Sequence, residues 1–162
     1  MPMEYNRQMA VDYAHRWAFG RNPKYYNFDN LGGDCTNFAS QCLFAGSGKM
    51  NYKKTFGWYY GNLNNRSPSW TGVVYLYNFL TANKGPGPFG HAARIEDAEE
   101  GDLVQLQFFS KDRFSHSPVI VKVHAPTPAG ILIAAHSDDS DFRPLDTYPY
   151  KNYRVIHIDG VR

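Results

Sequence analysis

The chain has 162 residues, a length that normally folds as one domain around one hydrophobic core. Its formal net charge is only +2 and no basic run occurs, so the sequence gives no argument for a nucleic-acid or anionic membrane partner. No apolar stretch approaches the ~20 residues of a membrane span, and residues 1–20 lack the apolar region and cleavage site of an export signal. We expect one domain over residues 1–162. Its localisation stays open, because the chain is equally compatible with a cytoplasmic protein and with the catalytic portion of a longer exported polypeptide.

Three segments in the first half of the chain have the apolar spacing of helices. The first predicted helix spans residues 4–19, the second begins at the first cysteine and covers residues 35–45, and the third covers residues 72–83. Gly46 is expected to terminate the second helix. Residues 47–71 form a long segment rich in Gly, Asn, Tyr and Trp, which we expect to be a functional loop.

Short β-branched runs replace the helical period in the second half. They predict four strands, at residues 103–109, 118–123, 131–135 and 153–158, with glycine and proline at residues 85–90 forming a turn before them. Consecutive strands after a block of helices favour an α+β domain with an antiparallel sheet.

The glycine turn Gly32–Gly33 delivers Cys35 to the first turn of the second predicted helix. A helix N-terminus has partial positive charge and unpaired N–H groups, so it favours a thiolate and can hold an oxyanion. Cys42 lies seven residues further along the same helix, and at ~10.5 Å the two Cα atoms are too far apart for a disulfide. Cys35 is therefore a candidate nucleophile, with a core thiol as the alternative, and Cys42 is expected in the core.

Polar residues mark the ends of two neighbouring predicted strands. His116 opens the second strand and His136 closes the third, so an antiparallel sheet places both at the same edge. Cysteine catalysis needs a base to remove the thiol proton and a further polar group to orient the base. The sequence offers these parts: a cysteine at a helix start, a histidine on one strand and a polar group on the next strand. Alternatively, each histidine is a structural residue at a strand end.

Seven motifs along the chain resemble one known family. They are Gly33–Phe38, Ser40–Cys42, Gly57–Tyr60, Leu76–Leu80, Gly101–Leu106, His116–Ser117 and Arg143–Leu145. Their order and spacing resemble the amidase domain family of firmicute bacteria, and the resemblance runs from about Tyr5 to Arg162. That family is similar to the NlpC and CHAP branch of papain-like cysteine hydrolases. The resemblance implies a papain-like α+β fold, with N-terminal helices packed on a C-terminal antiparallel sheet, and hydrolysis of an amide or peptide bond.

The resemblance also implies roles for individual residues. It places the nucleophile at Cys35, the base at His116 and the third polar group at His136. Asp138 or Asp139 could orient the ring instead, unless both belong to a solvated turn. The implied substrate is a peptide or another amide, a bacterial cell-wall peptide first of all. No cofactor and no metal are implied, and the oligomeric state stays open.

We expect hydrogen-bond donors around the cysteine that stabilise the oxyanion formed when its sulfur attacks a carbonyl group. The backbone N–H of Cys35 is the first of them. The resemblance to the papain group implies a side-chain donor shortly before the cysteine, which suggests Asn27 or Asn30. Asp34 cannot donate when ionised, so we expect it to cap the helix by accepting backbone N–H bonds. Its charge opposes thiolate formation at Cys35 unless His116 is protonated.

Two other classes of function remain open at this point. A non-catalytic glycan- or peptide-binding module would use the flat aromatic residues of the long segment, which could equally form an auxiliary core. These residues are Trp58, Tyr59, Tyr60 and Trp70. A zinc hydrolase would use the first cysteine and the two strand-end histidines as three ligands, although no His-Glu-x-x-His motif supports it.

Overall fold

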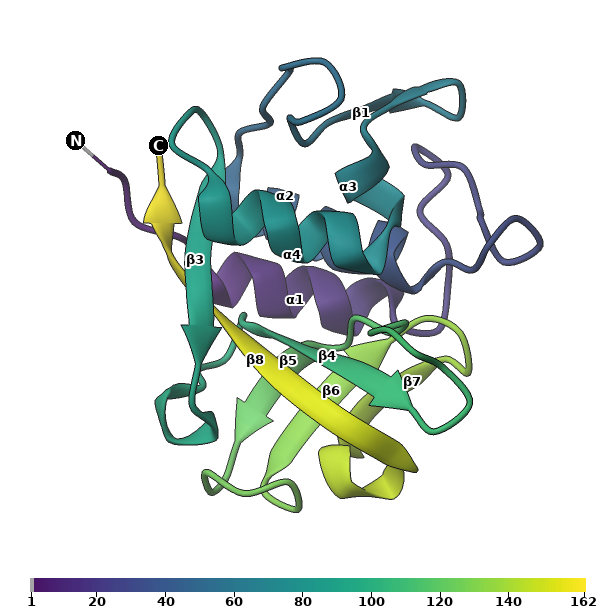
Figure 1. Ribbon diagram of the computed structural model, residues 1–162, viewed down its shortest axis with the longest axis vertical. Coiled ribbons are helices and arrows are strands. Elements are labelled where there is room, and N and C mark those ends of the chain that lie inside the picture. Colours follow the sequence, from purple (N-terminus) through teal and green to yellow (C-terminus); the bar gives the residue numbers. More distant parts are fainter. Residues whose placement is uncertain (1) are drawn as a thin grey trace.

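A computed structural model describes residues 2–162 of the protein. The fold is α+β: helices from the first half of the chain pack on an antiparallel sheet that is built mainly by the second half (Figure 1). The two ends of the chain meet, since Met3 pairs with Val161 as an isolated antiparallel bridge. No helix within residues 2–162 is long and apolar enough to cross a membrane.

The described residues contain four α-helices and two short 3-10 helices. Their bounds are α1 Arg7–Trp17, α2 Cys35–Ser47, α3 Pro68–Thr71, α4 Val73–Ala82, η1 Ile95–Asp97 and η2 Leu145–Thr147. The three predicted helices are confirmed as α1, α2 and α4. The predicted end of α2 is wrong, because the helix continues through Gly46 to Ser47. Gly46 serves close packing instead, since a Cβ atom there would lie 2.5 Å from the ring of Tyr5.

Six strands form the main sheet in the order β3-β8-β4-β5-β6-β7, and every pairing is antiparallel. Their bounds are β3 Pro88–Ala93, β4 Leu103–Phe108, β5 Val119–Val123, β6 Ile131–Ala135, β7 Ser140–Pro144 and β8 Tyr150–Val161. The four predicted strands are confirmed as β4, β5, β6 and β8.

The sequence did not predict the two edge strands β3 and β7. The glycine and proline turn predicted at residues 85–90 is wrong for residues 88–90, which belong to β3 and pair with the second half of β8. Proline is tolerated at the first position of an edge strand, so Pro88 does not prevent this pairing. β7 is polar and only partly buried, and it is held by its pairing with β6.

The long segment between α2 and α4 is structured. It contains α3 and a small hairpin of β1 (Tyr60–Asn62) and β2 (Asn65–Arg66). Trp58 and Trp70 are fully buried against α2, with ring centroids 4.8 Å apart. The indole of Trp58 donates to Ser40 Oγ, and that of Trp70 donates to Asn37 Oδ1. The two tryptophans thus belong to the core, and the auxiliary-core alternative is confirmed for them.

Both faces of the sheet are buried. One face packs against α1, α2 and α4 in a core that includes Leu103 and Val119, while the alternating residues Val104 and Ile120 join a second cluster on the other face. Val119 at the start of β5 lies opposite Ala134 near the end of β6, so His116 and His136 belong to the same edge of the sheet as predicted. The N-terminus of α2 meets the sheet at this edge.

Candidate active site

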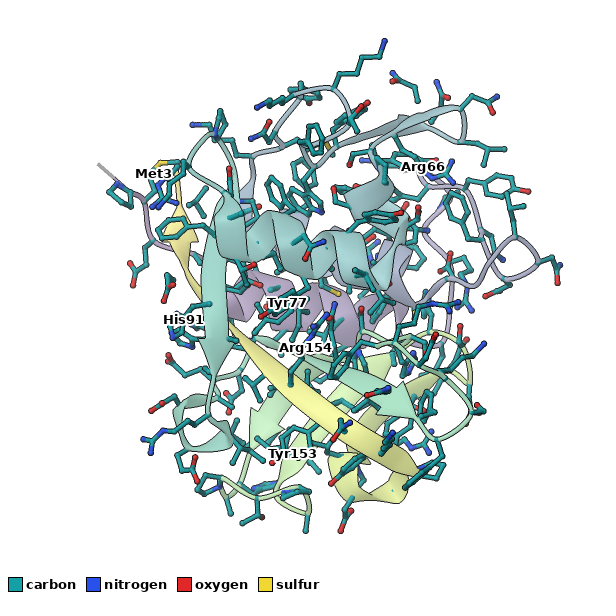
Figure 2. The ribbon with its side chains drawn as sticks, in the orientation of Figure 1. Met3, Arg66, Tyr77, His91, Tyr153 and Arg154 are labelled. Atoms are coloured by element: carbon teal, nitrogen blue, oxygen red, sulfur yellow. The ribbon has the colours of Figure 1, made fainter. Side chains whose placement is uncertain are left out.

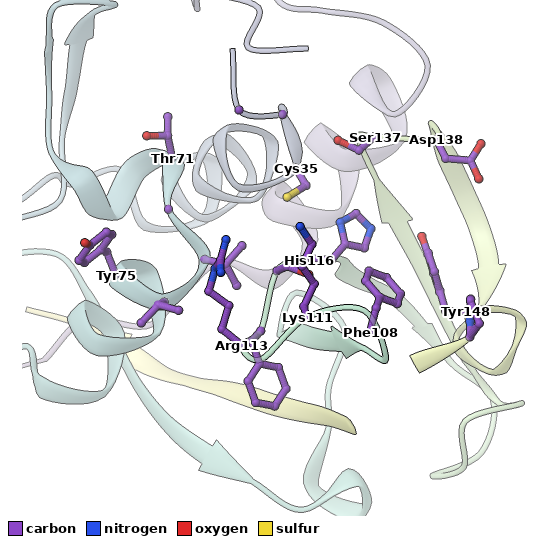
Figure 3. A pocket seen from close by; sticks show the side chains of 18 of the residues that line it. Cys35, Thr71, Tyr75, Phe108, Lys111, Arg113, His116, Ser137, Asp138 and Tyr148 are labelled. Atoms are coloured by element: carbon purple, nitrogen blue, oxygen red, sulfur yellow. The ribbon is translucent and has the colours of Figure 1, made fainter. Parts of the chain in front are cut away.

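Cys35 and His116 line the same cleft, which has a volume of about 920 Å³ (Figure 3). One wall is the segment of residues 71–75, where α3 passes into α4, and another is the loop of residues 111–116 between β4 and β5. The turn after β6 contributes Ser137 to the rim. The structure thus brings together the predicted nucleophile and the predicted base, although they are 81 positions apart in the sequence.

The turn that positions Cys35 depends on glycine. Gly32 and Gly33 have φ angles of +87° and +96°, a region that residues with a Cβ atom rarely adopt. Cys35 follows as the first residue of α2 and is partly exposed at the cleft. The turn is closed immediately before the helix by the carbonyl of Phe28, which accepts the backbone N–H groups of Leu31 and Gly33 at 2.9 and 3.0 Å.

Asp34 does not cap α2 as predicted. Its side chain accepts no backbone N–H from the first turn of the helix. Instead, Oδ1 accepts the backbone N–H of Phe28 and the side-chain amide of Asn37, and Oδ2 contacts His136. The guanidinium of Arg21 lies 3.5 Å from the same Oδ2. Asp34 therefore fixes the loop before the helix, and its carboxylate does not bind the first backbone N–H groups of α2.

His136 is buried and directs both ring nitrogens away from the cleft. Nδ1 contacts the Asp34 carboxylate, Nε2 donates to the carbonyl oxygen of Trp17 at 2.7 Å, and the ring stacks on Phe38. A carbonyl oxygen only accepts, so Nε2 is the donor in its hydrogen bond, and Nδ1 is occupied by the Asp34 carboxylate. These contacts do not support the prediction that His136 orients the ring of His116, because neither nitrogen is left to do so.

His116 presents a buried, neutral imidazole. Its backbone carbonyl accepts the N–H of Leu106 at 3.0 Å, which fixes the residue beside β4. The ring packs near Phe108 and Tyr148, with centroids 6.2 and 5.5 Å away. Burial, together with the positive charge of Arg143, lowers the pKa of His116 to about 4. At neutral pH this imidazole is therefore unprotonated and can accept a proton.

The Cys35 sulfur has hydrogen-bonding groups around it. Burial and the charge of Asp34 raise the pKa of the thiol, while the hydroxyl of Thr36 and the backbone N–H of Ser117 lower it. The Thr36 hydroxyl lies 3.6 Å from the sulfur. Cys35 and His116 are thus both neutral at rest, with donors in place for a thiolate.

A buried polar network lies next to the Cys35 thiol, on the side away from the cleft. The Thr36 hydroxyl donates to Ser117 Oγ at 3.3 Å, and Gln105 Nε2 donates to the same oxygen at 3.2 Å and to the backbone carbonyl of Val73 at 3.0 Å. Arg154 donates twice to Gln105 Oε1 and lies over the ring of Tyr77 (Figure 2). The local sequence pattern did not predict this network. Its signal is a glutamine inside the otherwise apolar start of β4.

The acidic turn after β6 has two different parts. Asp138 lines the cleft, is exposed and pairs with Arg143 at 3.1 Å, whereas Asp139 pairs with Arg21 at 2.9 Å outside it. Ser137 and Asp138 both have positive φ angles, +64° and +63°, which is uncommon for residues other than glycine. Asp138 therefore lies in the same cleft as His116, the proposed base. Asp139 lies outside the cleft, near the Asp34 carboxylate.

Neither predicted side-chain donor to the oxyanion lies at the cleft. Asn27 and Asn30 are exposed and absent from its lining in the described part of the chain. The Asn27 side chain instead accepts the backbone N–H of Asp29. The loop before Cys35 turns away from the cleft at these positions, which the spacing of residues alone did not reveal.

The three proposed zinc ligands are not assembled. Among residues 2–162, no three His, Cys, Asp or Glu side chains are placed so that they could share a metal ion. Cys35 and His116 meet at the cleft, but His136 has both nitrogens engaged elsewhere. The zinc alternative thus lacks its third ligand.

Comparisons with known proteins agree with the resemblance seen in the motifs. A family model described as Putative amidase domain matches residues 4–158. The chain is also 36% identical over 123 residues to the uncharacterized protein YhbB of Bacillus subtilis (strain 168), covering 73% of this chain and 37% of that relative. No solved structure matches the chain. Because the family model covers nearly the whole sequence, this protein belongs to the Putative amidase domain family, whose description indicates an amide-bond hydrolase.

Proposed function

We propose that residues 1–162 form one papain-like domain that hydrolyses an amide or peptide bond through Cys35 and His116. The observation that carries this proposal is the placement of both residues at one cleft, with Cys35 as the first residue of α2. Family membership gives the bond type, and the cleft gives the groups that would attack it.

The first half of the reaction forms an acyl-enzyme. His116 accepts the proton of the Cys35 thiol as the sulfur attacks the substrate carbonyl carbon. The resulting oxyanion receives a hydrogen bond from the backbone N–H of Cys35 at the positive end of α2. His116 then gives its proton to the leaving nitrogen, the C–N bond breaks, and a thioester to Cys35 remains.

The second half of the reaction restores the enzyme. His116 takes a proton from a water molecule, whose oxygen attacks the thioester carbonyl. Collapse of this second tetrahedral species breaks the C–S bond and releases a carboxylic acid. The proton on His116 returns to the departing sulfur, so both residues are again neutral.

The pKa values of the two residues determine when charge appears. Burial raises the pKa of the Cys35 thiol and lowers that of His116 to about 4, so the thiolate–imidazolium pair is disfavoured before substrate binds. His116 then acts as a general base during attack. The Thr36 hydroxyl and the N–H of Ser117 stabilise the sulfur while it carries negative charge.

A bacterial cell-wall peptide is the first substrate to test. The family that the motifs resemble is similar to a branch of cysteine hydrolases that includes NlpC and CHAP domains, and the curated relative comes from Bacillus subtilis. The cleft, at about 920 Å³, has room for several residues of an extended peptide.

Hydrolysis of purified cell-wall peptide fragments tests the proposal. Product release by the wild-type protein should fall by a factor of about 10³ or more in Cys35→Ala and by a factor of about 10² or more in His116→Gln. Cys42→Ala is the matched control, because this thiol is buried in the core and should not affect turnover. Equal turnover by wild-type protein and Cys35→Ala would refute the mechanism.

A further inference from the structure

Three cationic side chains line the cleft, and two of them, Lys111 and Arg113, are not paired with another residue of the lining, whereas Arg143 is paired with Asp138. Lys111 and Arg113 come from the loop between β4 and β5, and both line the cleft together with Cys35. Figure 3 shows their side chains rising from this loop toward the side of the cleft where the sulfur lies. The loop is held in place, since the N–H of Lys111 donates to Phe108 and its carbonyl accepts the side-chain amide of Gln107.

These two charges are not balanced by the rest of the cleft. Lys111 makes no ion pair with any other described residue, and Arg113 pairs at 3.4 Å only with its neighbour Asp112, which is almost fully exposed. An exposed pair of this kind is weak and readily exchanged for another partner. Asp138, the acidic residue of the lining, is already paired with Arg143.

The opposite wall has no charge of its own. It is formed by the start of α4, where Val74 and Tyr75 present exposed apolar surface to the cleft. A basic substrate would find no free acidic partner on either wall. An acidic substrate would find a lysine and the planar fork of an arginine, which suits a carboxylate.

We propose that the substrate is acidic, with a carboxylate within about one residue of the cleaved amide, and that Lys111 and Arg113 bind this carboxylate. This proposal rests on the hydrolase function proposed above, since it concerns the same cleft. It names the chemical class of the substrate, a peptide with an acidic side chain or a free terminal carboxylate next to the scissile bond.

Two small alkylating probes test the proposal without knowledge of the natural substrate. One is N-chloroacetyl-glutamate, and the other is its neutral counterpart N-chloroacetyl-glutaminamide. In both cases the Cys35 sulfur displaces chloride and forms a thioether, which peptide mass spectrometry detects. Each rate is divided by the rate of the same probe with glutathione, and the ratio of the two corrected rates measures recognition of the carboxylates. Any effect of the cations on the thiol itself cancels in this ratio.

The wild-type protein should favour the acidic probe by about five- to tenfold at low salt, and the preference should shrink at ~0.5 M salt. The double variant Lys111→Gln/Arg113→Gln should have a ratio near one. Lys122→Gln is the matched control, because this exposed lysine on β5 is outside the cleft lining, and it should keep the wild-type ratio.

The outcomes separate this proposal from the one on which it rests. Equal corrected rates for the two probes, with Cys35 modified by both, would overturn the acidic substrate and leave the hydrolase intact. A preference that survives in the double variant would overturn the roles of Lys111 and Arg113. Failure of both probes to modify Cys35 would contradict the hydrolase function and the acidic substrate together.

Discussion

The carboxylate of Asp34, one residue before the proposed nucleophile, is paired with the buried ring of His136. This contact joins the start of α2 to the end of β6 and thereby places Cys35 at the edge of the sheet where His116 lies. The second ring nitrogen of His136 binds the carbonyl of Trp17 at the end of α1, so three elements meet at one side chain. We assign His136 to positioning rather than to orientation of the base.

Loss of this pair should destabilise the protein. His136→Asn leaves the Asp34 charge buried with fewer partners, which should lower the free energy of unfolding by about 3–5 kcal/mol in urea denaturation. His91→Asn is the matched control, because His91 forms a similar pair with Asp159 at the exposed surface, and the expected loss there is at most about 1 kcal/mol. An unchanged stability of His136→Asn together with a large fall in kcat would instead support the ring-orienting role.

The stability of the protein should depend on pH through His116. The ordinary pKa of a histidine is 6.5, whereas the pKa of His116 in the folded protein is about 4. At a pH between these two values, the unfolded chain binds a proton that the folded chain does not. The free energy of unfolding should therefore decrease by about 3 kcal/mol in total as the pH falls from about 6.5 to about 4. Urea denaturation at several pH values measures this decrease.

A variant without the imidazole isolates this contribution. His116→Gln should lose clearly less stability than the wild-type protein over the same pH range, whereas the exposed residue His124, changed to Gln, should leave the curve unaltered. Parallel curves for wild-type protein and His116→Gln would show that His116 is not buried in its neutral form.

Thr36 should control the reactivity of the thiol. When Cys35 is a thiol, the Thr36 hydroxyl donates to Ser117, and when Cys35 is a thiolate the same hydroxyl can turn toward the sulfur. Thr36→Val removes this donor at similar volume and should slow alkylation by iodoacetamide about three- to tenfold near neutral pH, with the pH midpoint shifted upward. Thr36→Ser should restore both values.

A second threonine serves as the control for this experiment. Thr81 donates to the carbonyl of Tyr77 on the exposed side of α4, so Thr81→Val should leave the alkylation profile of Cys35 as it is. If Thr36→Val has the wild-type midpoint, the hydroxyl is a packing group and takes no part in stabilising the thiolate.

The sequence predicted the central strands better than the edges of the sheet. β4, β5, β6 and β8 have β-branched runs that identify them locally, whereas β3 contains Pro88 and Gly90 and β7 is mostly polar. Such segments become strands only because a neighbour, β8 or β6, offers backbone partners. Pairing between distant segments is not visible in a local pattern.

The candidate site was predictable as a set of residues but not as a set of contacts. The chemistry of a thiol at a helix start identified Cys35, and strand order put His116 and His136 at one edge. Strand order does not say where a ring points, so the engagement of His136 by Asp34 and Trp17 appeared only with the side chains. The same holds for Trp58, whose indole contacts the buried Ser40.

Trp58 should contribute to stability rather than to binding. It is fully buried between α2 and α4, so Trp58→Ala should lower the free energy of unfolding by about 3–5 kcal/mol. Tyr52 in the same segment is 75% exposed, and Tyr52→Ala should change stability by at most about 0.5 kcal/mol. If the Trp58→Ala protein is as stable as the wild type and has a raised KM for peptide fragments, Trp58 contributes to substrate binding and the prediction is wrong.

Graded alkylation of the folded protein tests the central claim that Cys35 carries the hydrolysis. Samples are modified by iodoacetamide to increasing extents, and each is assayed for hydrolysis of cell-wall peptide fragments and mapped for modification of Cys35 and Cys42. We predict that the fraction of activity remaining equals the fraction of unmodified Cys35, while Cys42, which is buried in the core, stays unmodified. Undiminished hydrolysis by protein whose Cys35 is fully alkylated, or modification of Cys42 ahead of Cys35, would contradict the account.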